Sequence, residues 1–499
     1  MNETGGKQDS TAASTPQPGS LIADITEATG AKRQDEDFAP KEKRLGTAIA
    51  AILEVWPSAN AADRKLDRKL VDRLIAECDQ RLGAQIDAIL HNSQVQALES
   101  TWRGLKLLCD RTDFRENIRI DILSCTKDEL AEDFADAPEV MRTGLYGKVY
   151  KAELGQFGGD PYGAIVTDYY FGPSSRDIAL LRDIAAVGAM SHAPVLAGAG
   201  PQFFGKESFE DMDGIGDLSD VITPENPTYS KWFGFRETQD ARYVGLAMPR
   251  ILLRKPYNPE DNPNLGFNYD ENVSEAHNDY LWGNASFAFA TRLSESFAKY
   301  RWCANIIGPQ SGGAVDNLPV HTFESGGRVT AKVPTEIYLP DARDMELSEQ
   351  GFIPLLMRKH SDNAAFFGAP STRMPLRYPS DKDSETNEKL GCQLPYMFII
   401  SRLAHYIKVI QRENIGRGYS REQFHSDLEK WLRKYVAANV TNDPKVMATK
   451  PLKAAQIEVT DIPGEPGWYR VHLRVSPHFK YQGAYFELSL VGRLETDEK

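Results

Sequence analysis

The stretch Ala164-Ile-Val-Thr-Asp-Tyr-Tyr-Phe171 opens the part of the sequence that decides the fold. It is rich in β-branched and aromatic residues and follows the turn-forming cluster Phe157-Gly-Gly-Asp-Pro161, a pattern typical of a strand. The periodicity of the next segment predicts a helix over Asp177–Met190, and the short apolar run Pro194–Ala197 is typical of a buried strand. Strand, helix and strand in this order indicate an α/β unit with crossover connections.

The same alternation of short strands and helices predicts an α/β body from about Ile118 to Leu339. Ile118–Leu123 alternates apolar and polar residues, as a half-buried strand does. A helix is expected over Asn284–Tyr300, and further short strands are expected at Thr335–Leu339 and Leu355–Arg358.

Two long amphipathic helices precede this body. The apolar residues of the first recur at nearly every fourth position: Leu66, Leu70, Leu74, Cys78, Leu82, Ile86 and Leu90. Those of the second lie three or four residues apart: Val95, Leu98, Trp102, Leu105 and Leu108. Because only His91-Asn92-Ser93 separates the two patterns, we expect a helical hairpin whose apolar stripes belong to the core.

The last part of the sequence predicts a small α+β module. A polar loop is expected at Tyr378–Lys389, followed by helices over Tyr396–Glu413 and Ser420–Val436. Three strands are expected after them: Ala455–Val459, Trp468–Val475 and Tyr485–Val491. In the second strand, side chains are expected to alternate between two faces, with Tyr469, Val471, Leu473 and Val475 on one face and Arg470, His472 and Arg474 on the other.

The first part of the chain differs in composition. Met1–Gly19 contains no Leu, Ile, Val or aromatic residue, so it cannot bury enough apolar surface to offset its ordering entropy and is expected to be disordered. The apolar segment Leu21–Ile25 is followed by the charged stretch Ala31–Arg44. The chain is therefore expected to divide into a disordered tail (1–19), an extended arm and linker (20–60), a body with the helical hairpin and the α/β sheet (61–380), and a C-terminal module (381–499).

Composition excludes some classes of function. The 499 residues include 58 Lys and Arg against 71 Asp and Glu, a formal net charge of −13, which argues against a protein that binds the nucleic-acid backbone. The five cysteines include no Cys-x-x-Cys pair, so reduced and mostly buried thiols are expected. Met1–Gly19 has no signal-peptide core, and no run of about 18 apolar residues occurs, so we expect a cytoplasmic protein without a membrane partner.

One loop nearly matches a nucleotide-binding motif. Gly200-Pro-Gln-Phe-Phe-Gly-Lys-Glu207 has the spacing of a phosphate-binding loop, but Glu207 stands where Ser or Thr would bind magnesium and Pro201 lacks an amide donor. The nine histidines occur singly, and no set of nucleophile, base and oxyanion donors is visible. We expect no catalytic residues, no metal and no cofactor, with a nucleotide-binding enzyme that uses Gly200–Glu207 as an alternative.

Both ends of the sequence carry strand-forming segments. Leu21–Ile25 is tethered by flexible residues, and the C-terminal strands are expected to present an open sheet edge. An open edge pairs readily with a strand from another chain. The residues therefore indicate a large non-enzymatic assembly protein with a reaching arm.

Ordered sequence blocks from about Leu66 to the end of the chain carry a family resemblance. In chain order they are Ala97–Lys106, Phe157–Gly163, Pro249–Tyr257, Leu281–Ala285, Leu318–Phe323, Pro334–Glu336, Ala364–Gly368, Leu394–Tyr396, Ser401–Tyr406, Pro466–Arg470 and Pro477–Phe479. On these blocks the chain resembles the large sheath subunit of the bacterial type VI secretion system, the TssC/VipB family. The resemblance implies a C-terminal module related to contractile phage tail sheath domains, so the expected fold is mixed α/β and α+β.

The resemblance also implies partners and a structural role. In that family the large subunit pairs with a smaller sheath subunit, and neighbouring copies stack as rings into a helical tube around an inner tube protein. The sheath assembles on a baseplate, and its contraction drives the inner tube outward. A ClpV-type ATPase recycles the contracted sheath, mainly through the small subunit. A phage-tail-like sheath subunit that polymerises alone is the alternative within this class.

Two sets of residues are candidate assembly sites. Docking of the arm by strand addition onto the C-terminal sheet would involve Leu21, Ile22, Asp24, Ile25, Ile457, Val459, Arg470, His472 and Arg474. The helix Ser420–Val436 is the candidate for facing the inner tube, through its polar residues Arg421, Glu422, His425, Glu429, Lys430 and Arg433. Such residues would make weak and releasable electrostatic contacts. The alternative is that this helix only packs on the sheet.

Overall fold

The computed structural model describes residues 68–478 and 486–490, apart from residues 265, 274–276, 326–327, 360, 379–380, 417–419, 438–442 and 465–467. The chain divides into two compact units, Met1–Gln80 and Arg81–Lys499. The predicted tail and arm, including residues 21–25, lie outside the described residues.

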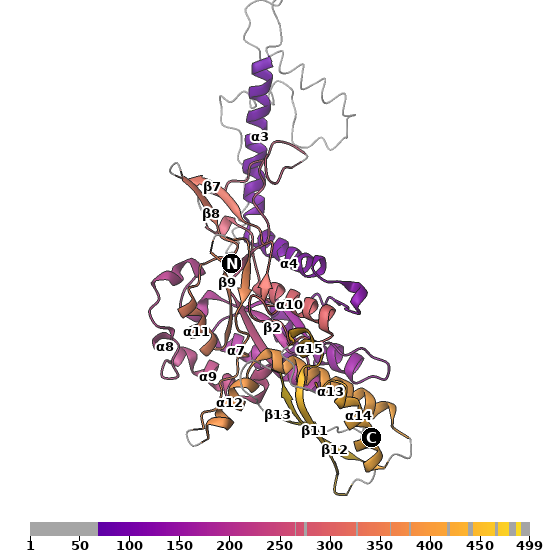
Figure 1. The fold of residues 1–499 in the computed structure, drawn as a ribbon. Coiled ribbons are helices and arrows are strands. Elements are labelled where there is room, and N and C mark those ends of the chain that lie inside the picture. The colour runs from indigo at the N-terminus through magenta and orange to yellow at the C-terminus, as the bar shows by residue number, and fades with distance from the viewer. Residues whose placement is uncertain are drawn as a thin grey trace, which may run out of the picture. The chain divides into compact units, whose positions relative to one another are not determined.

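A six-stranded sheet forms the centre of the body (Figure 1). Its strands, in spatial order, are β1 (Ile165–Phe171), β2 (Val195–Ala199), β3 (Val244–Met248), β9 (Phe352–Met357), β10 (Ala364–Phe366) and β6 (Ala314–Val315). The first four strands are parallel, and β10 is antiparallel to both of its neighbours. All residues of β2 and β3 are buried, as expected for parallel strands covered on both faces. The predicted α/β body is confirmed.

Helices cover both faces of this sheet. Along β2, Val195 and Ala197 belong to one apolar core and Leu196 to another, because successive side chains of a strand point to opposite faces. The first core includes residues of α7 (Ser175–Ser191), α9 (Ser230–Arg236) and α11 (Asp341–Glu349). The second includes residues of α4 (Ser93–Asp110), α10 (Ala285–Tyr300) and α13 (Leu394–Glu413).

Shorter elements complete the body. The remaining helices before the C-terminal module are α3 (Arg68–Leu90), α5 (Lys127–Asp136), α6 (Gly144–Tyr146), α8 (Leu218–Val221) and α12 (Lys382–Gly391), with a π-helix at Gly147–Leu154. Two antiparallel ribbons pair β4 (Ile251–Leu252) with β5 (Trp282–Gly283) and β7 (His321–Ser325) with β8 (Arg328–Lys332). Single 3-10 turns occur at Phe114–Glu116, Val140–Arg142, Pro201–Phe204, Phe209–Gly214, Pro227–Tyr229, Gln239–Tyr243 and His277–Asp279.

Two predicted strands are wrong. Residues 118–123 form no strand and pair with none of the described strands, and Ile122 is 66% exposed. Residues 335–339 contain only an isolated bridge between Thr335 and Ile251. Both segments contain residues that favour a strand. A strand also needs a partner strand to hydrogen-bond with, and that partner comes from distant parts of the chain.

The polar loop predicted at residues 378–389 is also wrong, because much of it belongs to α12, which runs from Lys382 to Gly391. The carboxylate of Glu388, on this helix, lies 2.7 Å from the guanidinium of Arg242. The ion pair joins the helix to the body. Because α12 has no apolar stripe, its sequence does not show the hydrophobic periodicity that would predict a helix.

Both predicted helices form, as α3 and α4, but much of their apolar stripes is exposed. Leu82 on α3 is 47% exposed, and Leu98 and Trp102 on α4 are 62% and 61% exposed. The buried residues of α4 are Ser100, Gly104 and Leu108, and of these only Leu108 belongs to the predicted stripe. Small side chains at the first two of these positions allow α4 to approach the neighbouring helix closely.

Gly104 brings α4 against α10. An ideal Cβ atom at Gly104 would lie 2.4 Å from Cδ2 of Phe287 on α10. Phe287 belongs to the second apolar core and is 7% exposed. A side chain at residue 104 would therefore force either the ring or the helix to move.

The substitution Gly104→Ala is expected to lower the free energy of unfolding by about 1–3 kcal/mol, because it overpacks the contact between α4 and α10. Gly83 on α3 is the matched control, since a Cβ atom there would lie 3.6 Å from Tyr269, an ordinary contact. Urea denaturation of the two variants measures the difference. Equal stability of Gly104→Ala and Gly83→Ala would contradict the expectation.

The C-terminal module combines helices with a three-stranded antiparallel sheet (Figure 1). Its helices are α13, α14 (Arg421–Arg433) and the short α15 (Pro444–Thr449). The strand order is β11 (Leu452–Asp461), β12 (Tyr469–Pro477), β13 (Phe486–Leu490). Ser420 begins α14 with a capping box, in which its hydroxyl accepts from the Gln423 amide while the Gln423 side chain accepts from the Ser420 amide. The predicted α+β module is confirmed.

Candidate functional site

The sheet of the C-terminal module has one apolar and one polar face. Ile457 and Val459 of β11 are 8% and 7% exposed and belong to a core shared with β12, α13 and α14. The opposite face of β12 carries Arg470, His472 and Arg474, of which Arg474 is the most open to solvent. The alternation predicted along β12 is therefore found.

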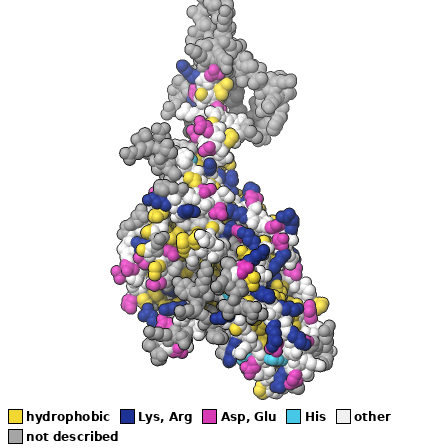
Figure 2. Space-filling view, viewed as in Figure 1, with side chains coloured by type: hydrophobic (Ala, Val, Ile, Leu, Met, Phe, Trp, Pro, Cys, Tyr) yellow, Lys and Arg dark blue, Asp and Glu magenta, His cyan; other side chains and the backbone are white. Residues whose placement is uncertain are grey.

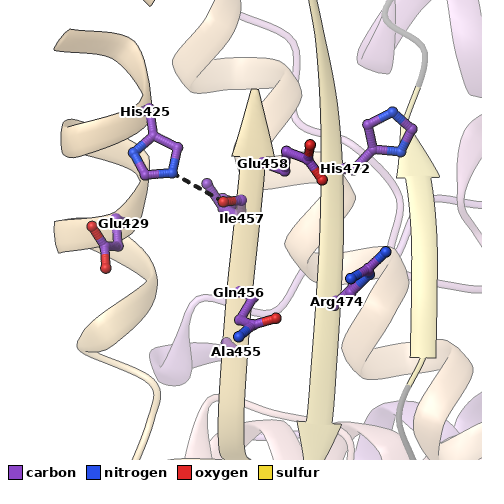
Figure 3. Close-up of a pocket in the computed structure, with 8 residues that line it drawn as sticks. All are labelled: His425, Glu429, Ala455, Gln456, Ile457, Glu458, His472 and Arg474. Atoms are coloured by element: carbon purple, nitrogen blue, oxygen red, sulfur yellow. Dashed lines mark hydrogen bonds between the residues drawn. The ribbon is translucent and has the colours of Figure 1, made fainter. Parts of the chain in front are cut away.

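Helix α14 lies beside β11, on the side away from β12 (Figure 3). Near the start of the helix, a guanidinium nitrogen of Arg421 lies 3.2 Å from Asp461, the last residue of β11. One turn later, the Nε2–H of His425 donates to the carbonyl of Ile457 at 3.0 Å. The backbone just after the helix bridges to the first residue of β11. The helix and the strand thus run alongside each other in opposite directions.

An open groove of about 250 Å³ lies where α14 meets β11 (Figure 3). Its lining includes the acidic side chains of Glu429 and Glu458 and the basic side chain of Arg474. The full lining is His425, Glu429, Ala455, Gln456, Ile457, Glu458, His472 and Arg474. Among the described residues, no group of three or more His, Cys, Asp or Glu side chains is arranged to hold a metal ion.

The residues predicted to dock strands fall into different environments. Residues 21–25 lie outside the described part of the chain. Ile457 and Val459 direct their side chains into the core, so only their backbone could take part in pairing. β12 is the middle strand and both of its edges are already paired. Strand docking at this sheet remains a prediction.

The residues predicted to face an inner tube are divided between two surfaces. Arg421, Glu422, Lys430 and Arg433 are exposed, whereas His425 and Glu429 are half-buried at the groove. The buried face of the helix consists of Phe424, Leu428 and Leu432. Charged side chains of both signs cover this end of the molecule (Figure 2). Ion pairs between such exposed groups contribute little and are screened by salt, and tube contact remains a prediction.

The loop that resembles a phosphate-binding motif is tightly closed on itself. The amides of Phe203, Gly205 and Lys206 donate to carbonyls of residues 200–202. Phe203 and Phe204 are buried in the first core. Amides that are already bonded in this way are not presented to a phosphate group.

The apolar periodicity of α4 predicted core positions for Leu98 and Trp102, but the two side chains form an exposed apolar pair. The two side chains are one turn apart on α4, opposite the buried Ser100 and Gly104. The signal that identifies the buried face is this pair of small residues four positions apart. It was masked by the larger apolar residues around it.

The cysteines differ in their exposure to solvent. All five cysteines are free, Cys392 is buried, Cys78 is exposed and the others are partly buried. The prediction of mostly buried thiols is thus wrong for Cys78. None of the helices in the described ranges has the length and apolar character needed to cross a membrane.

Comparison with known proteins gives matches along most of the chain. The EvpB/VC_A0108 tail sheath N-terminal domain matches residues 72–373, and the EvpB/VC_A0108 tail sheath gpW/gp25-like domain matches residues 383–494. The type VI secretion system sheath protein TssC1 of Pseudomonas aeruginosa is 36% identical over 468 residues, which cover 92% of this chain and 93% of that protein. The contracted helical sheath of the anti-feeding prophage, solved by cryo-EM, aligns with 68% of this chain and 71% of its own at 10% identity. Its TM-score of 0.28 is too low to support an argument.

These matches define a tail-sheath protein, in which an N-terminal sheath domain precedes a gpW/gp25-like domain. More narrowly, the chain belongs to the EvpB/VipB family of type VI secretion sheath proteins, in agreement with the sequence blocks. It is a structural sheath subunit with the domains of a tail sheath.

Proposed function

We propose that this chain pairs with a small sheath subunit and polymerises into a cytoplasmic helical tube, whose contraction propels an inner tube with its effectors towards a target cell. The observation that carries the proposal is the similarity to the TssC1 sheath protein over 92% of the chain. The baseplate, the inner tube protein and a recycling ATPase that acts through the small subunit are its further partners. The role is structural, without catalysis or cofactor.

The apolar surface of α4 supports pairing with a second protein. Leu98 and Trp102 together expose a large aliphatic and a large aromatic side chain on one helix. Exposed apolar patches mark interaction sites, and Trp is enriched among residues that dominate binding energy. The helix is fixed to the body by its opposite face, so this surface is available without rearrangement.

The double substitution Leu98→Ser with Trp102→Ser is expected to weaken binding to the co-expressed small sheath subunit by at least about tenfold, because a Trp hot spot contributes about 2 kcal/mol or more. Unfolding of the isolated chain is expected to change little, since both side chains are exposed. Met345→Ser is the matched control, because Met345 is 67% exposed on α11. Unchanged co-purification of the double variant would place the partner elsewhere.

The chain ends supply the links between neighbouring copies. In this proposal the arm segment Leu21–Ile25 of one copy adds as a strand to the C-terminal sheet of the next, and α14 faces the inner tube. A contact between unlike surfaces that does not close generates a helical lattice. The polar residues between the arm segment and the body allow neighbours to rotate while they stay joined.

Electron microscopy of the chain co-expressed with its small partner tests the proposal. Long hollow tubes are expected from the pair, and no tubes from either protein alone. Tubes formed by this chain alone would favour the alternative of a phage-tail-like sheath without a small subunit.

Deletion of residues 1–26 is expected to leave the heterodimer intact and to abolish the tubes. A Lys206→Ala variant is expected to assemble as the unchanged protein does.

A further inference from the structure

The antiparallel ribbon of β7 and β8 is separate from the central sheet (Figure 1). Among the described strands, β7 and β8 pair only with each other. A two-stranded ribbon is marginally stable in water by itself, so its order depends on the contacts that hold it to the body. Two of these contacts are made at its base, where His321 of β7 is paired with Lys332 of β8.

The side chain of Lys332 joins β8 to the body. Its ammonium nitrogen lies 5.5 Å from the ring centroid of Tyr280 and 5.7 Å from that of Trp282. Both rings belong to a small apolar cluster, and a cation over an aromatic face is attracted by it. The same ammonium donates to Nδ1 of His277 at 2.8 Å. One amine therefore makes both the aromatic and the imidazole contact.

The bonds of His277 determine where its proton lies. An ammonium only donates, so Nδ1 accepts from Lys332 and the proton of the neutral ring is on Nε2. The Nε2–H donates to Oε1 of Glu336 at 3.0 Å. Burial alone would raise the pKa of Glu336, but hydrogen bonds from Arg250 and His277 outweigh it and hold the pKa below its usual value. Glu336 thus stays ionised in mild acid and keeps the Nε2–H, so a further proton on His277 goes to Nδ1.

Glu210 offers a second partner to Nδ1. It belongs to the 3-10 helix Phe209–Gly214, and its Oε1 lies 3.7 Å from Nδ1 of His277. A proton on Nδ1 converts this nitrogen from an acceptor into a donor, so the bond from Lys332 is lost. The imidazolium and the ammonium then repel each other at short distance, whereas the carboxylate of Glu210 attracts the imidazolium.

We propose that protonation of His277 releases the base of the β7–β8 ribbon from the body, because Nδ1 exchanges Lys332 for Glu210 as its partner. Histidine is the side chain whose charge most readily changes between pH 5 and pH 8. The ribbon is therefore held at pH 8 and released in mild acid. All the groups involved belong to one chain, so the inference does not depend on the proposed sheath partners.

Other titratable groups near this junction keep their partners. Nδ1 of His321 lies 2.9 Å from the hydroxyl of Tyr280, and burial lowers the pKa of His321, which favours its neutral ring in mild acid. Asp279, two residues after His277, lies 3.7 Å from the ring of His91. The guanidinium of Arg250 donates twice to Glu336, at 2.7 and 2.6 Å.

Hydrogen exchange of the full-length chain between pH 8 and pH 5.5 tests this proposal. Protection factors, which correct for the effect of pH on exchange itself, are expected to fall at least tenfold in β7 and β8 and to stay unchanged in β2 and β3. His277→Gln cannot titrate and Lys332→Met carries no charge, so each is expected to abolish the fall. Glu210→Gln is expected to move its midpoint to lower pH. His321→Gln is the matched control and is expected to respond as the unchanged chain does.

The proposal would be overturned by constant protection of the ribbon in the unchanged chain, or by an equal fall in His277→Gln. Loss of the response in His321→Gln alone would assign the switch to that residue and would also overturn it. Glu210→Gln leaves the contacts of the held ribbon in place, so it tests the exchange even where another variant loosens the ribbon at every pH. The same midpoint in Glu210→Gln and the unchanged chain would refute the exchange of partners.

Discussion

Replacing Arg254 with alanine is expected to lower the free energy of unfolding by about 3–5 kcal/mol, because it leaves the buried carboxylate of Glu271 without its guanidinium partner. The guanidinium of Arg254 lies 2.5 Å from Glu271 and 2.9 Å from Glu99, and the side chain is 6% exposed. Glu271 is fully buried and also accepts from the amide of Tyr257 at 2.9 Å. The cluster joins α4 to the chain that follows β4.

The same cluster adds to stability only when its carboxylates are ionised. Burial alone would raise the pKa of Glu99, but the guanidinium groups of Arg254 and Arg103 outweigh it and hold the pKa below its usual value. The contribution is therefore complete above the pKa of the unfolded chain and is lost as the pH falls through the lower folded value.

Urea denaturation at neutral pH measures the effect of Arg254→Ala. Arg119→Ala is the control, because Arg119 forms an exposed ion pair with Asp160 at 2.7 Å, and little change is expected there. Arg254→Lys keeps the charge but cannot bond two carboxylates in the same geometry, so only part of the loss should be recovered. If Arg254→Ala is as stable as the control, the cluster does not stabilise the body.

The substitution His405→Gln is expected to remove a large part of the acid instability of this protein. His405 on α13 is 3% exposed, and its Nε2–H donates to the carbonyl of Ser191, at the end of α7, at 2.8 Å. Its ring stands edge-on to that of His192, with centroids 6.2 Å apart. Burial lowers the pKa of His405 to about 4 and that of His192 to about 3.

A histidine with a lowered folded pKa weakens the fold in acid. Between about pH 6.5 and pH 4 the unfolded chain binds a proton at this residue and the folded chain does not, so stability falls as the pH falls. The shift at His405 corresponds to about 3 kcal/mol lost below pH 4. Glutamine retains a donor for the Ser191 carbonyl and does not titrate.

Thermal unfolding between pH 7.5 and pH 4 measures this difference. The unchanged protein is expected to lose melting temperature across the range, and His405→Gln to lose distinctly less. His472→Gln on the polar face of the C-terminal sheet is the control and is expected to follow the unchanged protein. Parallel profiles for all three would show that His405 does not govern acid stability.

Several parts of the fold could be predicted because their signals are local. The β-branched and aromatic run at β1, the apolar stretch of β2 and the three-to-four spacing in α13 and α14 each indicate their own structure. Residues 118–123 carry the same kind of signal and form no strand. Apolar and polar residues alternate along this segment, but none of the described strands pairs with it.

The candidate site shows the same division. The alternation of β12 predicted that Arg470, His472 and Arg474 would share a face, and they do. That β12 lies between β11 and β13, and that His425 covers the β11 edge, depends on contacts between residues far apart in the chain. No spacing in the sequence encodes the order of the strands in a sheet.

The class of this protein follows from its sequence alone, because ordered sequence blocks and local periodicities can be recognised without any knowledge of contacts. The buried face of α4, in contrast, is set by tertiary contacts. On α4, the small residues Ser100 and Gly104 are buried while the more hydrophobic Trp102 is exposed. Hydrophobicity alone would predict the opposite. The physical reason is that burial depends on how closely a neighbouring element approaches, and Gly104 allows α10 nearer than any larger side chain would.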